Sequence, residues 1–301
     1  MPELPEVETI RLGLQKYVVG HKIENVEVRL PKIFPGDPKQ VIGAKIIAAR
    51  RFGKGLVIDL SNGYSLAIHV KLTGQLVYRD PKTSKLPVSK AKVGTVPNKF
   101  THVIFKLKAK SGKRKNKNGD AVLYYNDQRR FGWIKVIPTN KVLEMPYFKG
   151  IGPEPQINVS KASGVSKGKL TFEKFRAIVS ISHVVIKFLL MDQKKIGGIG
   201  NIYANDALFL AGIDPRRKAH TLTEEEIKKL YKAIHTVMER GFKYGGASEL
   251  QFVNVLGQEG EYQNHSLVYG KKGKDCPNGN GKIKKIFLGG RGTFFCSACQ
   301  R

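Results

Sequence analysis

The chain has 301 residues, 41% of them hydrophobic, and its 53 Lys and Arg against 24 Asp and Glu give a formal net charge of +29. This length suits two compact domains, and the apolar content excludes a disordered chain. The basic excess predicts a polyanionic partner and favours nucleic acid over an anionic membrane. No apolar run reaches the length of a membrane helix and the acidic start differs from a signal peptide, so we expect a soluble, cytoplasmic protein with no membrane partner.

The first eight residues, MPELPEVE, combine two prolines with three carboxylates. If Met1 is removed, Pro2 becomes a secondary α-amine whose pKa of about 8 leaves a nucleophilic, unprotonated fraction near neutral pH. Glu3 stands beside it and could transfer the protons that such chemistry needs. A structural alternative is that the prolines stiffen a helix start whose positive end the acids favour. These residues alone leave both interpretations open.

After a first helix to about Lys16, short runs with turn signals between them predict a β-sandwich or barrel rather than a βαβ sheet. The expected strands are residues 23–28, 45–49, 55–60, 65–70, 75–78, 102–107, 121–126 and 132–137. Two stretches interrupt this pattern. Residues 80–98 contain three prolines and predict a mobile loop, whereas residues 106–117 contain seven basic residues and predict a protruding hairpin.

The second half of the chain has a different texture. Residues 138–166 have the composition of a linker. Four helices are then expected at 171–180, 184–193, 201–211 and 223–241, with Thr171 and Thr223 as N-caps. The last section, from Val268, is rich in Gly, Lys and Cys and predicts a small finger.

Seven blocks of this sequence resemble, in the same order, the bacterial formamidopyrimidine-DNA glycosylases. They are PELPEVET (2–9), RRFGK (50–54), HVKLTG (69–74), NDQRRFG (126–132), IGPEP (151–155), GIGNIYA (198–204) and GGRGTFFCSACQ (289–300). The resemblance covers the whole chain apart from the two interrupting stretches. Its specificity rests on the order of the blocks, since a single block of this size would be weak.

The resemblance implies an α+β fold: an N-terminal β-sandwich with a catalytic N-terminal helix, followed by a helix–two-turn–helix domain with a zinc-finger-like β-hairpin end. It divides the chain into a catalytic domain at 1–137, a linker at 138–166, the DNA-binding domain at 167–264 and the hairpin at 265–301. It also implies a monomeric base-excision-repair enzyme, a DNA glycosylase and AP lyase. Such an enzyme excises oxidised purines (8-oxoguanine and formamidopyrimidines) from damaged double-stranded DNA and nicks the strand by β,δ-elimination.

Five residues receive catalytic or supporting roles from this resemblance. Pro2 would attack the sugar C1′ and hold it as a Schiff base, while Glu3 would protonate the sugar oxygen. Glu6 would support the site, although a helix-capping carboxylate is an equal alternative. Lys54 and Arg291 complete the expected catalytic set.

Five further residues are expected to bind DNA. His69 and Asn201 would contact phosphates together with Lys54 and Arg291, and the glycine-rich helix start at Asn201 suits a phosphate. Leu72, Arg129 and Phe131 would fill the space left by a flipped nucleotide. Leu72 stands where relatives usually carry Met.

The finger departs from the family pattern. Relatives carry two Cys-x-x-Cys pairs that bind one zinc ion, but here Gly279 replaces one of the four cysteines, leaving Cys276, Cys296 and Cys299. We expect zinc bound by three cysteines, and the alternative is a hairpin that stands without metal.

Two other functions remain open at this point. One is a sister enzyme of the endonuclease VIII type, which acts on oxidised pyrimidines. The other is a catalytically silent relative whose basic surface only binds DNA.

Overall fold

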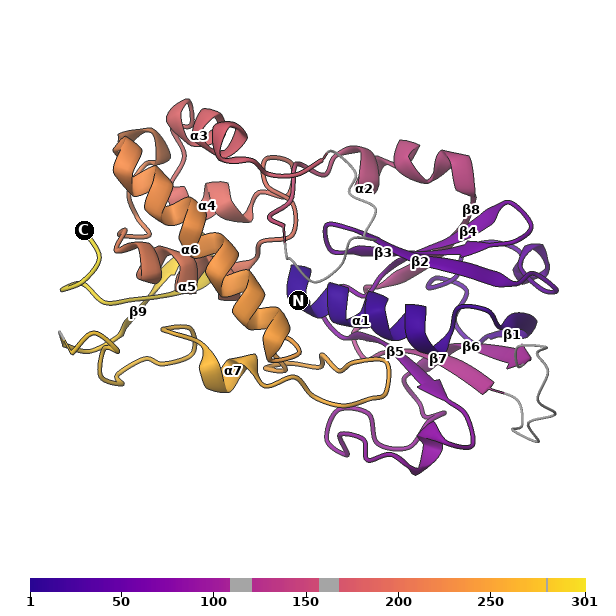
Figure 1. Ribbon diagram of the computed structural model, residues 1–301. Helices are drawn as coiled ribbons and strands as arrows, with labels where there is room; N and C mark the ends of the chain where they lie inside the picture. The colour runs from indigo at the N-terminus through magenta and orange to yellow at the C-terminus, as the bar shows by residue number, and fades with distance from the viewer. Residues whose placement is uncertain (109–120, 157–167, 280) are drawn as a thin grey trace.

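The computed structural model describes residues 1–108, 121–156, 168–279 and 281–301. Figure 1 shows a β-rich half and a helical half side by side, with the N-terminus lying between them. The expected basic hairpin beyond Lys108 and residues 157–166 of the expected linker lie outside the described residues. Among the described helices, none combines the length and apolarity needed to cross a bilayer.

The β-rich half is a sandwich of two four-stranded antiparallel sheets, in the orders β1-β6-β7-β5 and β2-β3-β4-β8. The strands are β1 (Lys22–Val28), β2 (Ile46–Phe52), β3 (Gly55–Leu60), β4 (Tyr64–His69), β5 (Gly74–Arg79), β6 (Thr101–Lys108), β7 (Ala121–Asp127) and β8 (Trp133–Pro138). Every strand expected from the sequence is present, with ends that shift by at most three residues, which is the usual uncertainty of boundaries.

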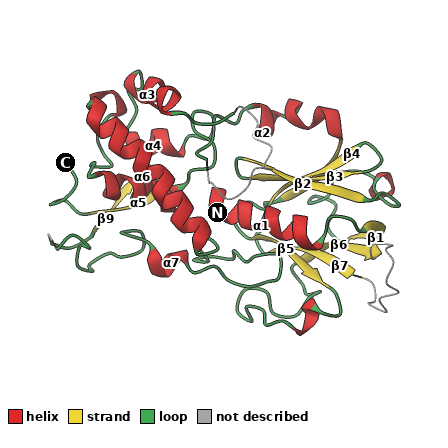
Figure 2. Ribbon diagram, in the orientation of Figure 1, coloured by secondary structure: helices red, strands yellow, loops and turns green. Residues whose placement is uncertain are grey.

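Helix α1 (Leu4–Tyr17) completes the sandwich core. Its buried residues Val7, Ile10 and Leu14 follow helical spacing and join the same apolar cluster as residues from both sheets. Figure 2 shows this helix beside the two sheets, with its N-terminal end directed toward the helical half. The sandwich therefore fixes the position of the first three residues.

The helical half is built around the contact of two helices, α5 and α6. Its helices are α3 (Phe172–Ser180), α4 (Ile186–Met191), α5 (Asn201–Ala211), α6 (Glu224–Lys243) and α7 (Tyr262–His265), followed by the hairpin of β9 (Lys284–Leu288) and β10 (Arg291–Phe295). The short helix α2 (Pro146–Lys149) lies against the sandwich instead (Figure 1), where Phe148 shares an apolar cluster with Phe52 and Val57. The expected cap of α6 is present, because Thr223 Oγ1 accepts from the Glu226 amide at 3.3 Å. The Glu226 carboxylate in turn accepts from the Thr223 amide. The helix expected at 184–193 is shorter, since Val185 is extended and pairs with Lys218.

A buried ionic network joins α1, β2 and the segment between the halves. Arg51 donates through Nε to Glu8 at 2.9 Å and through Nη1 to Glu154, while Glu8 also binds Arg11 at 2.7 Å. Glu154 lies in the expected linker but is fully buried. Residues 138–156 are therefore packed structure rather than a free connection, although the domain boundaries themselves stay a prediction.

The buried network predicts a large loss of stability in Arg51→Met. This change leaves the carboxylates of Glu8 and Glu154 short of their cation, which typically costs about 3–5 kcal/mol. Urea denaturation should show this loss. The control Lys141→Met removes a cation from an exposed pair with Glu144 and should leave the midpoint nearly unchanged. Equal midpoints for the two variants would contradict a stabilising role of the network.

Candidate active site

A cavity of about 130 Å³ opens where α1 meets α5 and the loop that follows α6. Its lining includes Pro2, Glu3 and Glu6 on one side, and Leu72 and Asn201 on others. Residues 247, 249, 250 and 252 form a further wall. The structure thus brings five of the expected site residues to one cavity.

Glu3 is held by the start of α5, which lies almost two hundred positions away in sequence. Its carboxylate accepts from the amides of Gly200 at 2.7 Å, Ile202 at 2.9 Å and Tyr203 at 3.4 Å. A carboxylate at a helix N-terminus is favoured by the unpaired amides and by the helix dipole. Glu3 therefore takes three amides of this helix start, and a phosphate contact at Asn201 stays a prediction.

Two glycines allow these carboxylates to approach the backbone. A Cβ on Gly200 would lie 2.3 Å from the Glu3 carboxyl carbon, so any larger residue would displace the carboxylate. Gly246 has a φ of +87°, and a Cβ there would lie 2.7 Å from Cγ of Glu6. Both glycines are thus required by close contacts with the first helix.

Glu6 is buried beneath Glu3 with both oxygens occupied. It accepts from the Glu3 amide at 2.7 Å, from the Tyr203 hydroxyl at 2.6 Å and from the Ala247 amide at 2.7 Å. Burial raises the pKa of Glu6, the charge of Glu3 raises it further, and the Tyr203 hydroxyl opposes this rise. Glu6 therefore caps the helix and also ties it to the loop at Ala247. Its supporting role in the reaction stays a prediction.

Cationic side chains gather beside this carboxylate pair. Lys54 is buried and donates from Nζ to the Ile199 carbonyl at 2.8 Å. Burial lowers the pKa of Lys54, Glu3 and Glu6 oppose this, and nearby Arg291 lowers it further. Arg291 itself is exposed and follows a two-glycine hairpin turn. Concentrated positive charge of this kind suits a phosphate group.

His69 is poised as a neutral hydrogen-bond donor. Its Nδ1 accepts from the Lys71 amide at 2.9 Å, which leaves the proton on Nε2. Burial, together with Lys71 and Lys54, lowers the pKa of His69 to about 3. The ring packs edge-on against Tyr147 at 4.9 Å, so its orientation is fixed.

Arg129 and Phe131 project from one exposed turn next to Leu72. The Phe131 ring is 52% exposed, and the Arg129 guanidinium lies 4.9 Å from its centroid. Buried Asp127 shapes the turn by accepting from the Gly132 amide at 2.8 Å and from the Thr73 hydroxyl. Thr73 in turn accepts from the Arg129 amide at 3.0 Å, which ties this turn to the segment of Leu72.

Sequence reasoning missed several residues that build the site. Tyr203 reads as an ordinary core position of a helix, and nothing local marks its bond to Glu6. Asn205 was also missed: it accepts from the Phe294 amide at 2.7 Å and, with the predicted Asn201, which donates to the Gly292 carbonyl at 3.1 Å, holds β10 against α5. Asp206, an acid without an assigned role, accepts from the amides of residues 267–269 and is a structural anchor.

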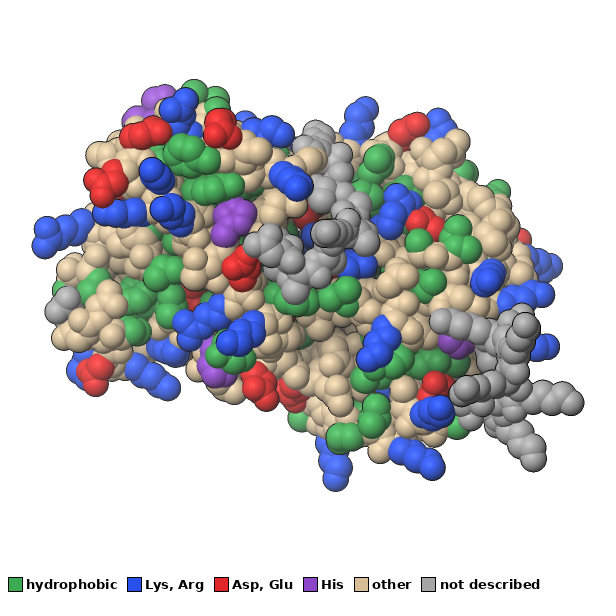
Figure 3. Space-filling view, in the orientation of Figure 1, with side chains coloured by type: hydrophobic (Ala, Val, Ile, Leu, Met, Phe, Trp, Pro, Cys, Tyr) green, Lys and Arg blue, Asp and Glu red, His purple; other side chains and the backbone are tan. Residues whose placement is uncertain are grey.

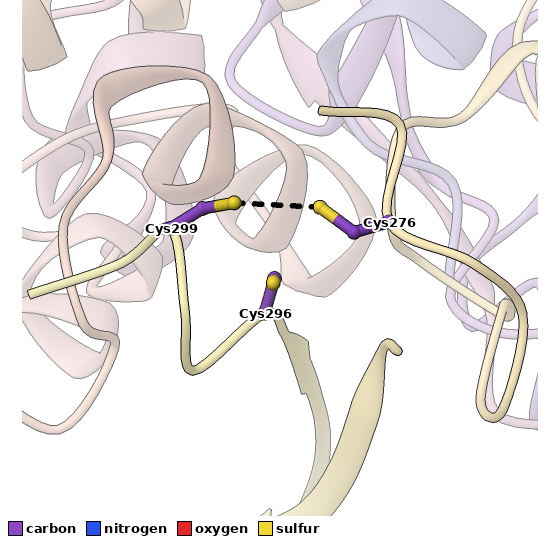
Figure 4. A group of neighbouring side chains, drawn as sticks. All are labelled: Cys276, Cys296 and Cys299. Carbon is purple, nitrogen blue, oxygen red and sulfur yellow. Dashed lines mark hydrogen bonds between the residues drawn. The ribbon is translucent and has the colours of Figure 1, made fainter. Parts of the chain in front are cut away.

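The three cysteines converge at the base of the hairpin. Figure 4 shows their sulfur atoms directed toward one another. All three sulfurs lie within 4.8 Å of one another, and those of Cys276 and Cys299 are 3.5 Å apart. No fourth His, Cys, Asp or Glu of the described residues joins them. This cluster could hold a metal ion, remote from the cavity at Pro2.

Both halves of the chain match domains of a known protein family. Residues 1–134 match the formamidopyrimidine-DNA glycosylase N-terminal domain, and residues 151–252 match the H2TH domain of the same enzymes. The formamidopyrimidine-DNA glycosylase of Pelotomaculum thermopropionicum is 38% identical over 100% of this chain and 99% of its own length. That of Streptococcus mutans is 34% identical, with both chains fully covered.

Solved structures agree with this assignment. The Lactococcus lactis Fpg bound to DNA containing N7-benzyl-Fapy-dG is 31% identical, covers 100% of both chains and has a TM-score of 0.81. The same protein bound to DNA containing an oxidised pyrimidine is 32% identical, with equal coverage and TM-score.

The fold and these matches define a DNA glycosylase, an enzyme class of DNA repair. The chain belongs to the formamidopyrimidine-DNA glycosylase family. The α+β fold expected from the sequence is thereby confirmed, as is the resemblance on which it was based.

The geometry predicts that Tyr203→Phe raises the pKa of Glu6 further, because the lost hydroxyl stabilised the ionised carboxylate. A carboxyl ¹³C titration by NMR measures this directly. Above the ordinary Glu pKa of 4.5, the folded chain then binds the proton more tightly than the unfolded chain, so stability falls more steeply with rising pH.

The matched control is Tyr262→Phe, which removes a hydroxyl bonded to Asp206 at 2.8 Å instead. The Glu6 titration should stay near its wild-type position in that variant. An unchanged Glu6 titration in Tyr203→Phe would contradict the geometry.

Proposed function

We propose that the chain is a bifunctional DNA glycosylase and AP lyase that excises oxidised purines from double-stranded DNA. The observation that carries this proposal is the cavity in which Pro2 adjoins Glu3, with Lys54 and Arg291 close by. A nucleophile, a proton-transfer group and cations for a phosphate are the parts that such a reaction needs.

The nucleophile in this proposal is the amine of Pro2 after removal of Met1. Pro2 is buried beneath Met1 in the full chain, and burial lowers the pKa of the α-amine at Met1, with Glu3 and Glu6 opposing the shift. An amine in these surroundings keeps an unprotonated fraction near neutral pH. Attack on C1′ displaces the base, and a secondary amine then gives an iminium, whose fixed positive charge assists elimination of the phosphates.

Glu3 is the group proposed to move protons. Three backbone amides fix its carboxylate next to Pro2, so its position relative to the sugar does not depend on a flexible side chain. It would protonate the ring oxygen of the sugar during attack and accept a proton during elimination. Glu6 would support the site through the Glu3 amide and Ala247.

DNA binding in this proposal uses two surfaces. His69, Lys54, Asn201 and Arg291 would contact phosphates around the lesion. Leu72, Arg129 and Phe131 would fill the gap left by the flipped nucleotide, and the exposed Phe131 ring suits insertion between bases. Figure 3 shows Lys and Arg side chains over both halves of the molecule, which suits a duplex that spans them.

The preference for oxidised purines is supported by the names of the relatives. The Lactococcus lactis Fpg has also been solved with DNA containing an oxidised pyrimidine, so a test must offer both lesions. We further propose a monomer, because one chain supplies every residue of this site, and a cytoplasmic enzyme acting on the chromosome.

Borohydride trapping tests the function. We expect a covalent adduct with duplex DNA containing 8-oxoguanine, formed faster than with thymine glycol, because the Schiff base at Pro2 is reducible. A permanent N-terminal extension should abolish the adduct, and Pro2→Gly should strongly reduce it, since each removes the secondary amine. No adduct from the wild type would favour a DNA-binding protein without catalysis, and faster trapping on thymine glycol would contradict the purine preference.

A structural zinc ion at Cys276, Cys296 and Cys299 forms part of the proposal. Zinc–sulfur bonds of about 2.3 Å in tetrahedral geometry place two sulfurs roughly 3.8 Å apart, close to the 3.5 Å between Cys276 and Cys299. Zinc would tie the ends of the hairpin that carries Arg291. Gly279 offers no ligand, so the fourth position would be left for water.

Metal analysis of the purified protein should find about one zinc ion per chain. Cys299→Ser should lose most of it, because two sulfurs hold zinc weakly. Ser297→Ala, which alters a residue between the two cysteines of the same loop, should keep it. A wild-type ratio near zero would contradict the proposed zinc and support the hairpin without metal.

A further inference from the structure

The geometry points to a positioning role for Lys92: it fastens the residue 80–98 segment to the loop that walls the cavity, and so holds the loop against the flipped base. This inference rests on the proposed function. We call residues 80–98 the inserted segment and residues 245–252 the wall loop. The sequence predicts only a mobile loop for the inserted segment, with no connection to the site.

Lys92 joins the inserted segment to Ser248 and Glu259. Its Nζ donates to the Ser248 carbonyl, within the wall loop, and to the Glu259 carboxylate at 2.6 Å. Ser89 donates from Oγ to the other Glu259 oxygen at 2.5 Å, and its amide donates to the Gly257 carbonyl at 2.9 Å. Lys92 is only 13% exposed, so these bonds are partly shielded from water and salt.

A buried glutamine of the sandwich holds the same two segments together. Gln75, on β5, donates from Nε2 to the Lys92 carbonyl at 3.1 Å and to the Gln251 carbonyl at 2.7 Å. Beside it, Val77, Val93 and Val253 form a small apolar cluster from β5, the inserted segment and the chain after the wall loop. The inserted segment is therefore attached to a rigid sheet as well as to the wall loop.

Ser248 is the point at which this attachment reaches the site. Its amide donates to Gln263 at 2.7 Å and its hydroxyl donates to the Phe252 carbonyl at 2.8 Å, which fixes the shape of the wall loop. The preceding residue, Ala247, donates to Glu6 at 2.7 Å and lines the cavity. The carbonyl held by Lys92 and the amide that binds Glu6 thus belong to adjacent residues.

These contacts place Lys92 on the base side of the reaction. The wall loop and the Pro2–Glu3 pair line the same cavity. A sugar held at Pro2 would leave its flipped base against the wall loop. A loosened wall would misplace the base and slow its removal. Cleavage of DNA that already carries an abasic site needs no base, so it should depend on Lys92 much less.

The test compares the two reactions in Lys92→Ala. Base excision from an 8-oxoguanine duplex should slow by about 10-fold to 100-fold, the range expected for a small misplacement of substrate. Strand cleavage at a preformed abasic site should slow much less than base excision does. Amide hydrogen exchange in the wall loop should become faster, and Lys92→Arg, which keeps a donor, should recover most of the excision rate.

Lys85→Ala is the matched control. Lys85 is an exposed lysine of the same inserted segment, so this variant removes the same charge without touching the wall loop. It should excise like the wild type. Equal excision rates for Lys92→Ala and the wild type, or an equal loss of excision and strand cleavage, would overturn the positioning role.

The outcomes separate this inference from the function on which it rests. A wild type that excises neither lesion contradicts the proposed function. In that case, faster wall-loop exchange in Lys92→Ala but not in Lys85→Ala would still support the attachment. Unchanged exchange in Lys92→Ala would overturn it, whatever the activity.

Discussion

The hydrogen bonds between the Glu3 carboxylate and the first amides of α5 are the contact on which the site depends. They join the start of the chain, placed by the sandwich, to a helix of the other half. The same contact satisfies amides that a helix start leaves unpaired, and it needs a glycine at position 200 to bring the backbone close enough. Glu6, Tyr203 and Ala247 repeat this connection one helical turn further on.

The structural role of Glu3 affects how the activity of Glu3 variants is interpreted. Because this carboxylate fastens two halves of the molecule, replacing it removes a structural contact together with the proposed proton-transfer group. A loss of activity in such a variant therefore mixes two effects. The Lys54 ammonium, which donates to the Ile199 carbonyl next to the same helix start, would also lose the nearby negative charge of Glu3.

Much of the fold could be predicted from local patterns. Alternating runs marked the strands, capping residues marked α6, and the terminal motif marked Pro2 and Glu3. Contacts between distant residues could not be predicted in this way. Nothing near Glu154 shows that it binds Arg51, 103 positions earlier. The composition of residues 138–166 instead predicts a linker. The inserted segment likewise looked like a loose loop, because its partners Gln75 and Glu259 belong to other parts of the chain.

Helix α5 carries three attachments along its length: Glu3 at its first amides, β10 through Asn201 and Asn205, and the turn at residues 267–269 through Asp206. Eleven residues rising 1.5 Å each make a rod of about 16 Å. The hairpin that precedes Cys296 and the Glu3 carboxylate are thus both attached to helix α5. If the hairpin tilted, helix α5 would tilt with it as a rigid body. The Glu3 carboxylate would then be displaced, although no charge had changed at either site.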